Sequence, residues 1–195
     1  MPAVAPAPLR PETGQRFRWT RERYDRAVDA GVLTTADRVE LLDGEIVQKM
    51  SQNEPHAVST TLASDLLRSV FGDGFHVRTQ LPIALSEVSE PEPDVAVVRG
   101  NVRDYLDDHP DPSSIVLLVE VADSSLMDDR VHKAILYADA GITEYWIVNL
   151  MDRLLEVHRE PVGAAYRTKT TFGPEGTVAP LHAPDARISV ADLLP

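Results

Sequence analysis

The chain has 195 residues, of which 43% are hydrophobic and 26% charged, and its 19 basic and 31 acidic residues give a formal net charge of −12. This composition is typical of one globular domain and excludes general disorder and fibrous repeats. Without cysteine there are no disulfides or cysteine-bound metals, and the longest aliphatic run, 115–119, is far below the roughly 18 residues of a membrane span, so we expect a cytoplasmic protein with no membrane segment.

The N-terminal third shows clear start and stop signals. In chain order they predict a flexible proline-rich tail over 1–15, a helix over 20–30, a β-hairpin over 39–50 and a helix over 55–71. Thr20 suits a helix N-cap and Gly31 a helix end. The dipeptide Asp43-Gly44 between apolar runs is a strong hairpin signal, and Pro55 suits a first helical turn. We expect residues 16–195 to form a single domain.

The rest of the chain alternates strand and helix patterns. The patterns predict one or two strands over 75–85, strands over 94–98 and 115–122, a helix over 127–140, strands over 145–150 and 154–160, and short edge strands over 165–171 and 187–190. The segment 115–122 is apolar on both faces up to Glu120, as in a central strand. Residues 115–150 therefore form a βαβ unit, and the fold class is α/β, or α+β with a mixed sheet.

Two carboxylates stand where an unpaired charge is costly. Asp94 follows Pro93 at the start of one predicted strand, and Glu120 interrupts the most apolar segment of the chain. Such residues are usually paired or bound to a metal, and two of them at neighbouring strand positions suit a hard cation such as Mg²⁺. The alternatives are a turn residue at the strand entry for Asp94 and a buried ion pair with an arginine for Glu120.

Lys133 is the third candidate, and it is one of three lysines against sixteen arginines. It lies on the predicted crossover helix after Glu120, so it can return to the same end of the sheet. Its compact ammonium can hold a phosphate oxygen or a water. The alternative is a surface pair with Asp129, four residues earlier on the helix.

Several common catalytic patterns are missing from the sequence. It contains no GxxxxGK[ST] phosphate loop, no GxGxxG, no GxSxG and no HExxH. The six histidines have no metal-ligand spacing. These observations argue against P-loop nucleotide hydrolysis and against a zinc site.

With these residues in view, the chain resembles a known family of nucleases. Pro93-Asp94 and a strand that ends in Glu120-Val121-Ala122 resemble the PD-(D/E)XK motif of restriction-endonuclease-like nucleases. A wider match identifies the chain with the Uma-type putative restriction endonuclease family, and it rests on residues 37–50, His56, 90–100, 117–150 and 154–160. The resemblance implies a mixed β-sheet flanked by helices and a divalent-metal site, holding Mg²⁺ or Mn²⁺, for DNA cleavage.

The resemblance also implies roles for individual residues. Asp94 and Glu120 would be the metal ligands, with the carbonyl of Val121 as a third. Glu40 resembles the additional acidic residue that the superfamily brings from its N-terminal part, and it completes the expected catalytic set with Lys133.

The chain departs from the superfamily motif at one position. The usual lysine two residues after the glutamate is Ala122 here, and the resemblance implies that Lys133 supplies it from the next helix, in the pattern Asp129…Lys133…Tyr137. His56, Gln80 and Tyr137 also fit the family pattern, with their roles left open. Asp123 and Ser124 are expected to cap the crossover helix.

The sequence therefore predicts a Mg²⁺-dependent endonuclease that hydrolyses DNA, and we expect a homodimer because two active sites related by a two-fold axis cut both strands most simply. Residues 20–50 and the later edge strands are the expected dimer interface. The net charge of −12 argues against this reading, because most nucleic-acid-binding proteins are basic. One alternative is a catalytically silent nuclease fold that binds DNA or a protein partner, and another is a metal-dependent hydrolase with a different substrate.

Overall fold

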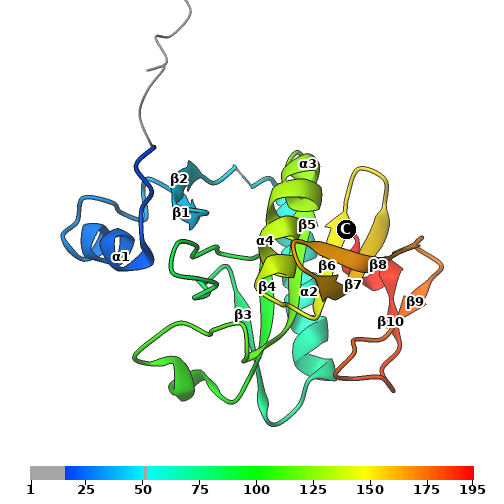
Figure 1. Ribbon diagram of the computed structural model, residues 1–195. Helices are drawn as coiled ribbons and strands as arrows, with labels where there is room; N and C mark the ends of the chain where they lie inside the picture. The colour runs from blue at the N-terminus through cyan, green and yellow to red at the C-terminus, as the bar shows by residue number, and fades with distance from the viewer. Residues whose placement is uncertain (1–15, 51) are drawn as a thin grey trace, which may run out of the picture.

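The computed structural model describes residues 16–50 and 52–195, and a six-stranded mixed sheet forms its centre (Figure 1). The tail predicted over 1–15 lies outside the described residues. The strands follow chain order across the sheet, and only β5 and β6 are parallel neighbours. They are β3 (Phe75–Thr79), β4 (Val95–Arg99), β5 (Ile115–Ala122), β6 (Glu144–Asn149), β7 (Leu154–Val162) and β8 (Ala165–Phe172).

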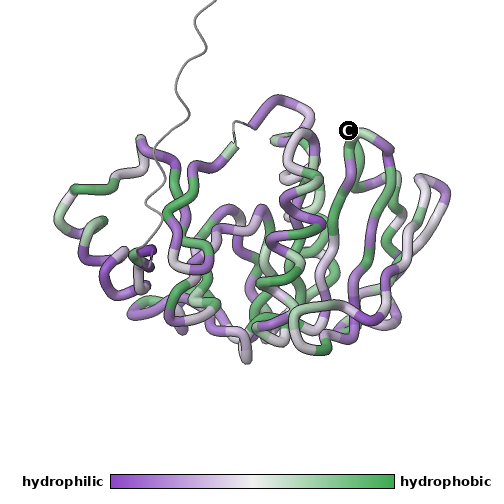
Figure 2. Tube along the Cα trace, turned by 45° about the horizontal axis from the view of Figure 1, so that its top comes forward, coloured by the Kyte–Doolittle hydropathy of each residue, from purple (hydrophilic) through white to green (hydrophobic). Residues whose placement is uncertain are grey.

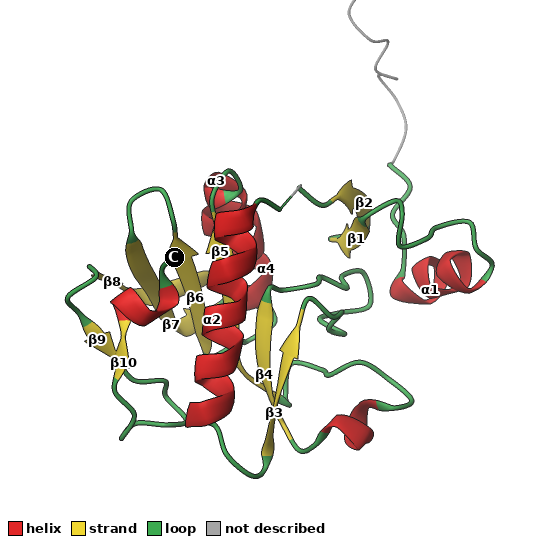
Figure 3. Cartoon of the chain, turned by 180° about the vertical axis from the view of Figure 1, so that it is seen from behind, coloured by secondary structure: helices red, strands yellow, loops and turns green. Residues whose placement is uncertain are grey.

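Helices cover both faces of this sheet. One face carries α2 (Glu54–Val70), which stands in front in Figure 3. The other face carries the β5–β6 crossover, made of α3 (Leu126–Asp128), the π-helical segment η2 (Asp129–Lys133) and α4 (Ala134–Asp139). Each face has its own buried apolar cluster, and Figure 2 shows hydrophobic stretches along the strands between the helices. The mixed sheet flanked by helices predicted from the sequence is confirmed.

The N-terminal elements lie beside the sheet rather than on it (Figure 1). They are α1 (Arg21–Asp29), β1 (Val39–Leu42) and β2 (Glu45–Gln48). Thr20 caps α1 as predicted, accepting from the backbone N–H of Arg23. The hairpin turns at Asp43-Gly44, where both residues have positive φ, and a Cβ on Gly44 would lie 2.8 Å from the Cβ of Arg18. Glycine is therefore required at this position.

The C-terminal segment closes the core on the α2 side. It contains β9 (Thr177–Val178), β10 (Ile188–Ser189) and a 3₁₀ turn, η3 (Val190–Leu193). Another 3₁₀ turn, η1 (Val102–Tyr105), follows β4. The Ser59 hydroxyl on α2 donates to the carbonyl of Leu193 at 2.6 Å, and Ile188, Val190 and Leu193 join the apolar cluster under α2.

Of the one or two strands predicted over 75–85, the structure has one, β3, because Gln80 turns the chain with a φ of 52° and Pro82 follows. Two other predicted elements differ from the structure. The crossover helix predicted over 127–140 has a π-helical turn in its middle. The strand predicted over 187–190 is shorter and pairs with β9 in a separate two-stranded sheet. Among the described residues, no helix is both long enough and apolar enough to cross a bilayer.

Glu90 links the hairpin to the body of the protein and makes stability depend on pH. It pairs with Leu41 of β1 through the backbone, and its side chain is 5% exposed. Burial, reinforced by the charge of Asp25, raises the pKa of Glu90 to about 7 against the opposing effect of Arg21. Because this folded-state pKa lies above the unfolded one, the stability that the neutral form provides is present below about pH 4.5 and lost as pH rises through 7.

We therefore expect Glu90→Gln, which is neutral at every pH, to be more stable than the wild type by roughly 2 kcal/mol at pH 8 and not at pH 4.5. Urea denaturation at the two pH values measures this difference. Glu87→Gln is the matched control, because Glu87 is exposed in the same loop. A stability difference for Glu90→Gln that is equal at both pH values would contradict the prediction.

Candidate active site

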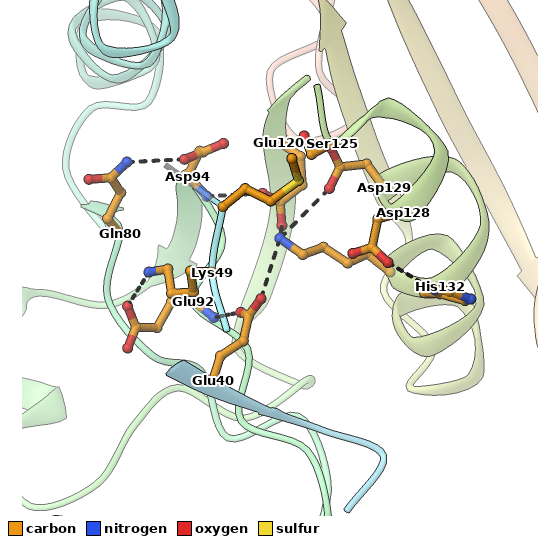
Figure 4. A network of polar contacts seen from close by, with 12 residues as sticks. Glu40, Lys49, Gln80, Glu92, Asp94, Glu120, Ser125, Asp128, Asp129 and His132 are labelled. Atoms are coloured by element: carbon orange, nitrogen blue, oxygen red, sulfur yellow. Dashed lines mark hydrogen bonds and ion pairs between the residues drawn. The ribbon is translucent and has the colours of Figure 1, made fainter. Parts of the chain in front are cut away.

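Asp94 and Glu120 meet because β4 and β5 are antiparallel neighbours. Val95 pairs with Val119, so the residue before β4 lies opposite the residue that follows Val119. The backbone N–H of Asp94 points at Oε2 of Glu120 at 3.4 Å, and both residues are buried, at 7% and 2% exposure. The two carboxylates singled out in the sequence therefore lie together at one end of the sheet (Figure 4).

Three donors hold the carboxylate of Asp94. Its Oδ2 accepts from the backbone N–H of Val121 at 2.8 Å and lies 3.1 Å from Nε2 of His56. Its Oδ1 accepts from the side-chain amide of Gln80 at 3.1 Å. Burial alone would raise the pKa of Asp94, but His56 and the Val121 N–H hold it below its usual value. Asp94 is thus ionised and held in place by contacts to three other residues, which a turn residue at the strand entry does not require.

Glu120 has a lysine partner rather than the arginine considered from the sequence. Its Oε1 lies 3.0 Å from Nζ of Lys133 and accepts from the hydroxyl of Tyr137 at 2.7 Å. Burial raises the pKa of Glu120 to about 8, while Lys133 opposes the rise. Burial therefore outweighs the effect of the Lys133 ammonium at this carboxyl group.

Lys133 is buried in a ring of carboxylates. It does pair with Asp129, as the alternative drawn from the sequence held, but this pair is buried and not at the surface. Lys133 is 9% exposed, and its Nζ lies 3.7 Å from Asp129 and 4.0 Å from Glu40. Burial would lower the pKa of Lys133, but Glu120, Glu40 and Asp129 raise it well above its usual value. The lysine is consequently protonated at any physiological pH.

Ala122 explains in part how Lys133 comes so close to Glu120. Ala122 lies two residues after Glu120 on β5, so both side chains point to the same face of the sheet. Ala122 is fully buried in the apolar cluster that includes Ala134 and Tyr137 of the crossover. The small side chains of Ala122 and Ala134 let the crossover approach β5, and Lys133 then reaches Glu120 from the helix.

The π-helical segment that carries Lys133 is anchored at several points. Arg130 makes a bidentate pair with Glu156 on β7, with Nε 3.0 Å from each carboxylate oxygen. The hydroxyl of Ser125 donates to Asp129 at 2.7 Å, and the hydroxyl of Tyr145 donates to the Asp129 carbonyl at 3.2 Å. π-Helical turns are frequent at functional sites, and this one presents Asp129 and Lys133 to the site.

The predicted capping of this helix by Asp123 and Ser124 is wrong. The residue at the N-cap of α3 is Ser125, and its side chain bonds to Asp129 instead of to a backbone N–H. Asp123 accepts from the side-chain amide of Asn53 at 2.5 Å. Because Asn53 caps α2, this contact ties the start of α2 to the end of β5.

The hairpin contributes Glu40 and a second ion pair to the site. Oε2 of Glu40 accepts from the backbone N–H of Glu92 at 2.9 Å, while Oε1 faces Lys133. Lys49, just after β2, lies 2.5 Å from Glu92. Figure 4 shows Glu40, Asp129 and Glu120 converging from separate segments, with the Lys49–Glu92 pair beside them. Sequence reasoning missed this pair, although Glu92 stands two residues before Asp94 and Lys49 is one of three lysines.

A small cavity opens over these residues, and its chemistry fits a hard cation. Asp94, Glu120, Val121 and Lys133 all line it. Within residues 16–50 and 52–195, no group of three or more histidine or acidic side chains is arranged to hold a metal by itself. Asp94 and Glu120 supply two carboxylates, which suffices for Mg²⁺ because that ion retains several waters. The contact that Val121 makes in the site is its backbone N–H, which donates to Asp94. Its predicted role as a carbonyl ligand stays a prediction.

The architecture of the described residues, a six-stranded mixed sheet between helices, has a counterpart among solved structures. The crystal structure of a putative nuclease belonging to DUF820 from Anabaena variabilis is similar over 85% of this chain and 94% of that one, with a TM-score of 0.66 and 17% sequence identity. This likeness shows the fold.

The chain belongs to the Uma2 family, whose description is "Putative restriction endonuclease" and whose model matches residues 22–191. The family resemblance inferred from the sequence is thereby confirmed. No curated protein matches the chain. The roles of Asp94, Glu120, Lys133 and Glu40 stay predictions.

Proposed function

We propose that this protein is a Mg²⁺- or Mn²⁺-dependent endonuclease that hydrolyses phosphodiester bonds of DNA. The family description supports a nuclease. The observation that carries the finer proposal is the contact of Lys133 with Glu120, 3.0 Å apart, beside Asp94 at the ends of two neighbouring strands. The entry of β4, the strand β5 and the crossover after it supply these three side chains.

The proposed roles follow from charge and burial. Asp94 is ionised and held by three donors, so it can bind a cation without rearrangement. Lys133 is protonated, and we assign it the positioning of the attacking water and the stabilisation of negative charge on the phosphate oxygens. Glu40 holds Lys133 from the hairpin side.

Asp94 and Glu120 would hold the divalent cation, with Val121 as the proposed carbonyl ligand. When bound, the cation lowers the pKa of a water and neutralises charge on the phosphodiester. Burial raises the pKa of Glu120 to about 8, and a nearby cation would favour the ionised form of this carboxyl group. The excess of carboxylates around one lysine is the feature that supports a cation here.

The test is an assay of purified protein on supercoiled plasmid with Mg²⁺, with Mn²⁺ and with EDTA. We expect nicked or linear DNA with either metal and intact plasmid with EDTA. Intact DNA under all conditions, together with binding of DNA, would instead support the catalytically silent module. Cleavage of a small phosphodiester without cleavage of DNA would support a hydrolase with another substrate.

The homodimer is part of this proposal and stays a prediction. Its support is the simplicity of cutting two strands with two sites related by a two-fold axis. The interface predicted over residues 20–50 and the edge strands includes α1, the hairpin and β8.

A further inference from the structure

A second cleft lies next to the catalytic cavity, between the N-terminal elements and the sheet. Its volume is about 490 Å³, within the range of small-ligand pockets. Val28 of α1, Leu33 and Val39 give it apolar walls, and the amides of Gln52 and Gln80 add hydrogen-bonding groups. The roles already assigned around Lys133 do not use this cleft.

The cleft and the catalytic cavity share one wall. Lys49, Gln52 and Glu92 line both of them, so the Lys49–Glu92 ion pair stands between the two spaces. Gln80 lines the cleft while its amide donates to Asp94. A ligand that extends from the catalytic cavity into the cleft would therefore pass directly over Lys49.

The charge of the cleft suits an anionic chain better than the cavity beside it does. The catalytic cavity is lined by many more acidic than basic side chains. The cleft is lined by two basic side chains, Arg38 and Lys49, against the single acidic Glu92. Because Lys49 is paired with Glu92, Arg38 is the one basic side chain of this lining left to attract a phosphate group, whereas the catalytic cavity has a large acidic excess.

Two residues of the cleft adopt a conformation that side chains rarely take. Arg38 and Gln80 have φ values of 50° and 52°, in the left-handed region. The guanidinium of Arg38 donates to the Met50 carbonyl, and the N–H of Gln80 bonds to the Pro93 and Asp94 carbonyls. Such strain persists where the surrounding structure imposes it, and it clusters at ligand sites.

From these observations we infer that the cleft binds one unpaired nucleotide of the substrate strand, next to the scissile phosphate that would face the cation proposed at Asp94 and Glu120, so that the enzyme acts on single-stranded or locally unpaired DNA. This inference rests on the proposed nuclease activity and not on the proposed homodimer, whose support is the cutting of both strands of a duplex. The apolar walls receive the base, the amides meet its edge, and Arg38 meets the neighbouring phosphate. A base in an intact duplex is stacked and paired, so it can enter a pocket only after it leaves the stack.

The experiment compares one DNA sequence as a single strand and as a full duplex, with bis(p-nitrophenyl) phosphate as a phosphodiester that has neither a base nor a neighbouring phosphate. We expect kcat/KM for the single strand to exceed that for the duplex by at least about tenfold. We expect Val28→Trp, which fills the cleft from α1, to lower the ratio of single-strand to small-substrate kcat/KM by at least about tenfold. Thr35→Trp, on another wall, should do the same.

Val32→Trp is the matched control, because Val32 is 71% exposed and lies four residues from Val28 outside the cleft. Equal rates on single strand and duplex, or an unchanged ratio in both cleft variants, would overturn the inference. If the wild type cleaves no DNA, the proposed function fails, and fluorescence anisotropy with a labelled oligonucleotide decides about the cleft. Preferential binding of the single strand, weakened by Val28→Trp, supports it; equal binding of both forms rejects it.

Discussion

Replacement of Lys133 with methionine is expected to lower the rate of DNA cleavage by about a hundredfold, the scale of losing one preorganised electrostatic contact to a transition state. Methionine keeps the length and apolar stem of the side chain but removes the ammonium beside Glu120. Affinity for Mn²⁺ should persist or rise, because a positive charge has left the carboxylate cluster. Single-turnover cleavage and calorimetry measure the two effects separately.

The same substitution should also destabilise the fold, by about 3–5 kcal/mol, because it leaves buried carboxylates without their partner. The sequence alone suggests a small effect, since a helix-surface pair contributes little; the burial of Lys133 reverses that expectation. Lys169→Met is the control, because Lys169 is exposed on β8. A Lys133→Met protein that is folded and cleaves at the wild-type rate would remove the lysine from the mechanism.

Glu120→Gln should weaken binding of Mn²⁺ by at least about a hundredfold and abolish cleavage, because it removes one of two carboxylate ligands. The amide oxygen can still accept from Tyr137, so we expect the fold to remain intact. The wild type should gain thermal stability in millimolar Mn²⁺, since the ion binds only the folded state, and the variant should not. Calorimetric titration and thermal melts in the presence and absence of Mn²⁺ check both expectations.

Glu160→Gln on β7 provides the matched control, because that side chain is exposed and away from the site. Unchanged Mn²⁺ affinity in Glu120→Gln would place the metal elsewhere. Loss of secondary structure in Glu120→Gln would mean that the Glu120 carboxylate is needed for folding. The Mn²⁺ affinity of Asp94→Asn would then test whether the metal binds at this site.

The sequence predicts the sheet well because the strong signals are local. The apolar run of β5 and the Asp43-Gly44 turn each depend on residues next to one another. Asp94 and Glu120 stand out because an unpaired carboxylate is costly in an apolar strand. The family resemblance adds the role of Lys133, which periodicity alone does not distinguish from a solvated helix residue.

Other features depend on contacts between distant segments and were not predictable in this way. The π-helical turn requires anchors on β6 and β7, including the Arg130–Glu156 pair. The burial of Lys133 requires Glu40 from the hairpin. The cleft beside the site arises from the distance between α1 and the sheet, which no local pattern encodes.

The order of strands in the sheet also affects how the chain can fold during synthesis. Because β3 to β8 follow chain order, each new strand can pair with the one made just before it, which favours early folding by local contacts. The core under α2 behaves differently, since Ile188, Val190 and Leu193 complete it. Until residues 188–193 have emerged from the ribosome, α2 and the sheet expose an unfinished apolar surface, so this face is the last part of the core to be closed.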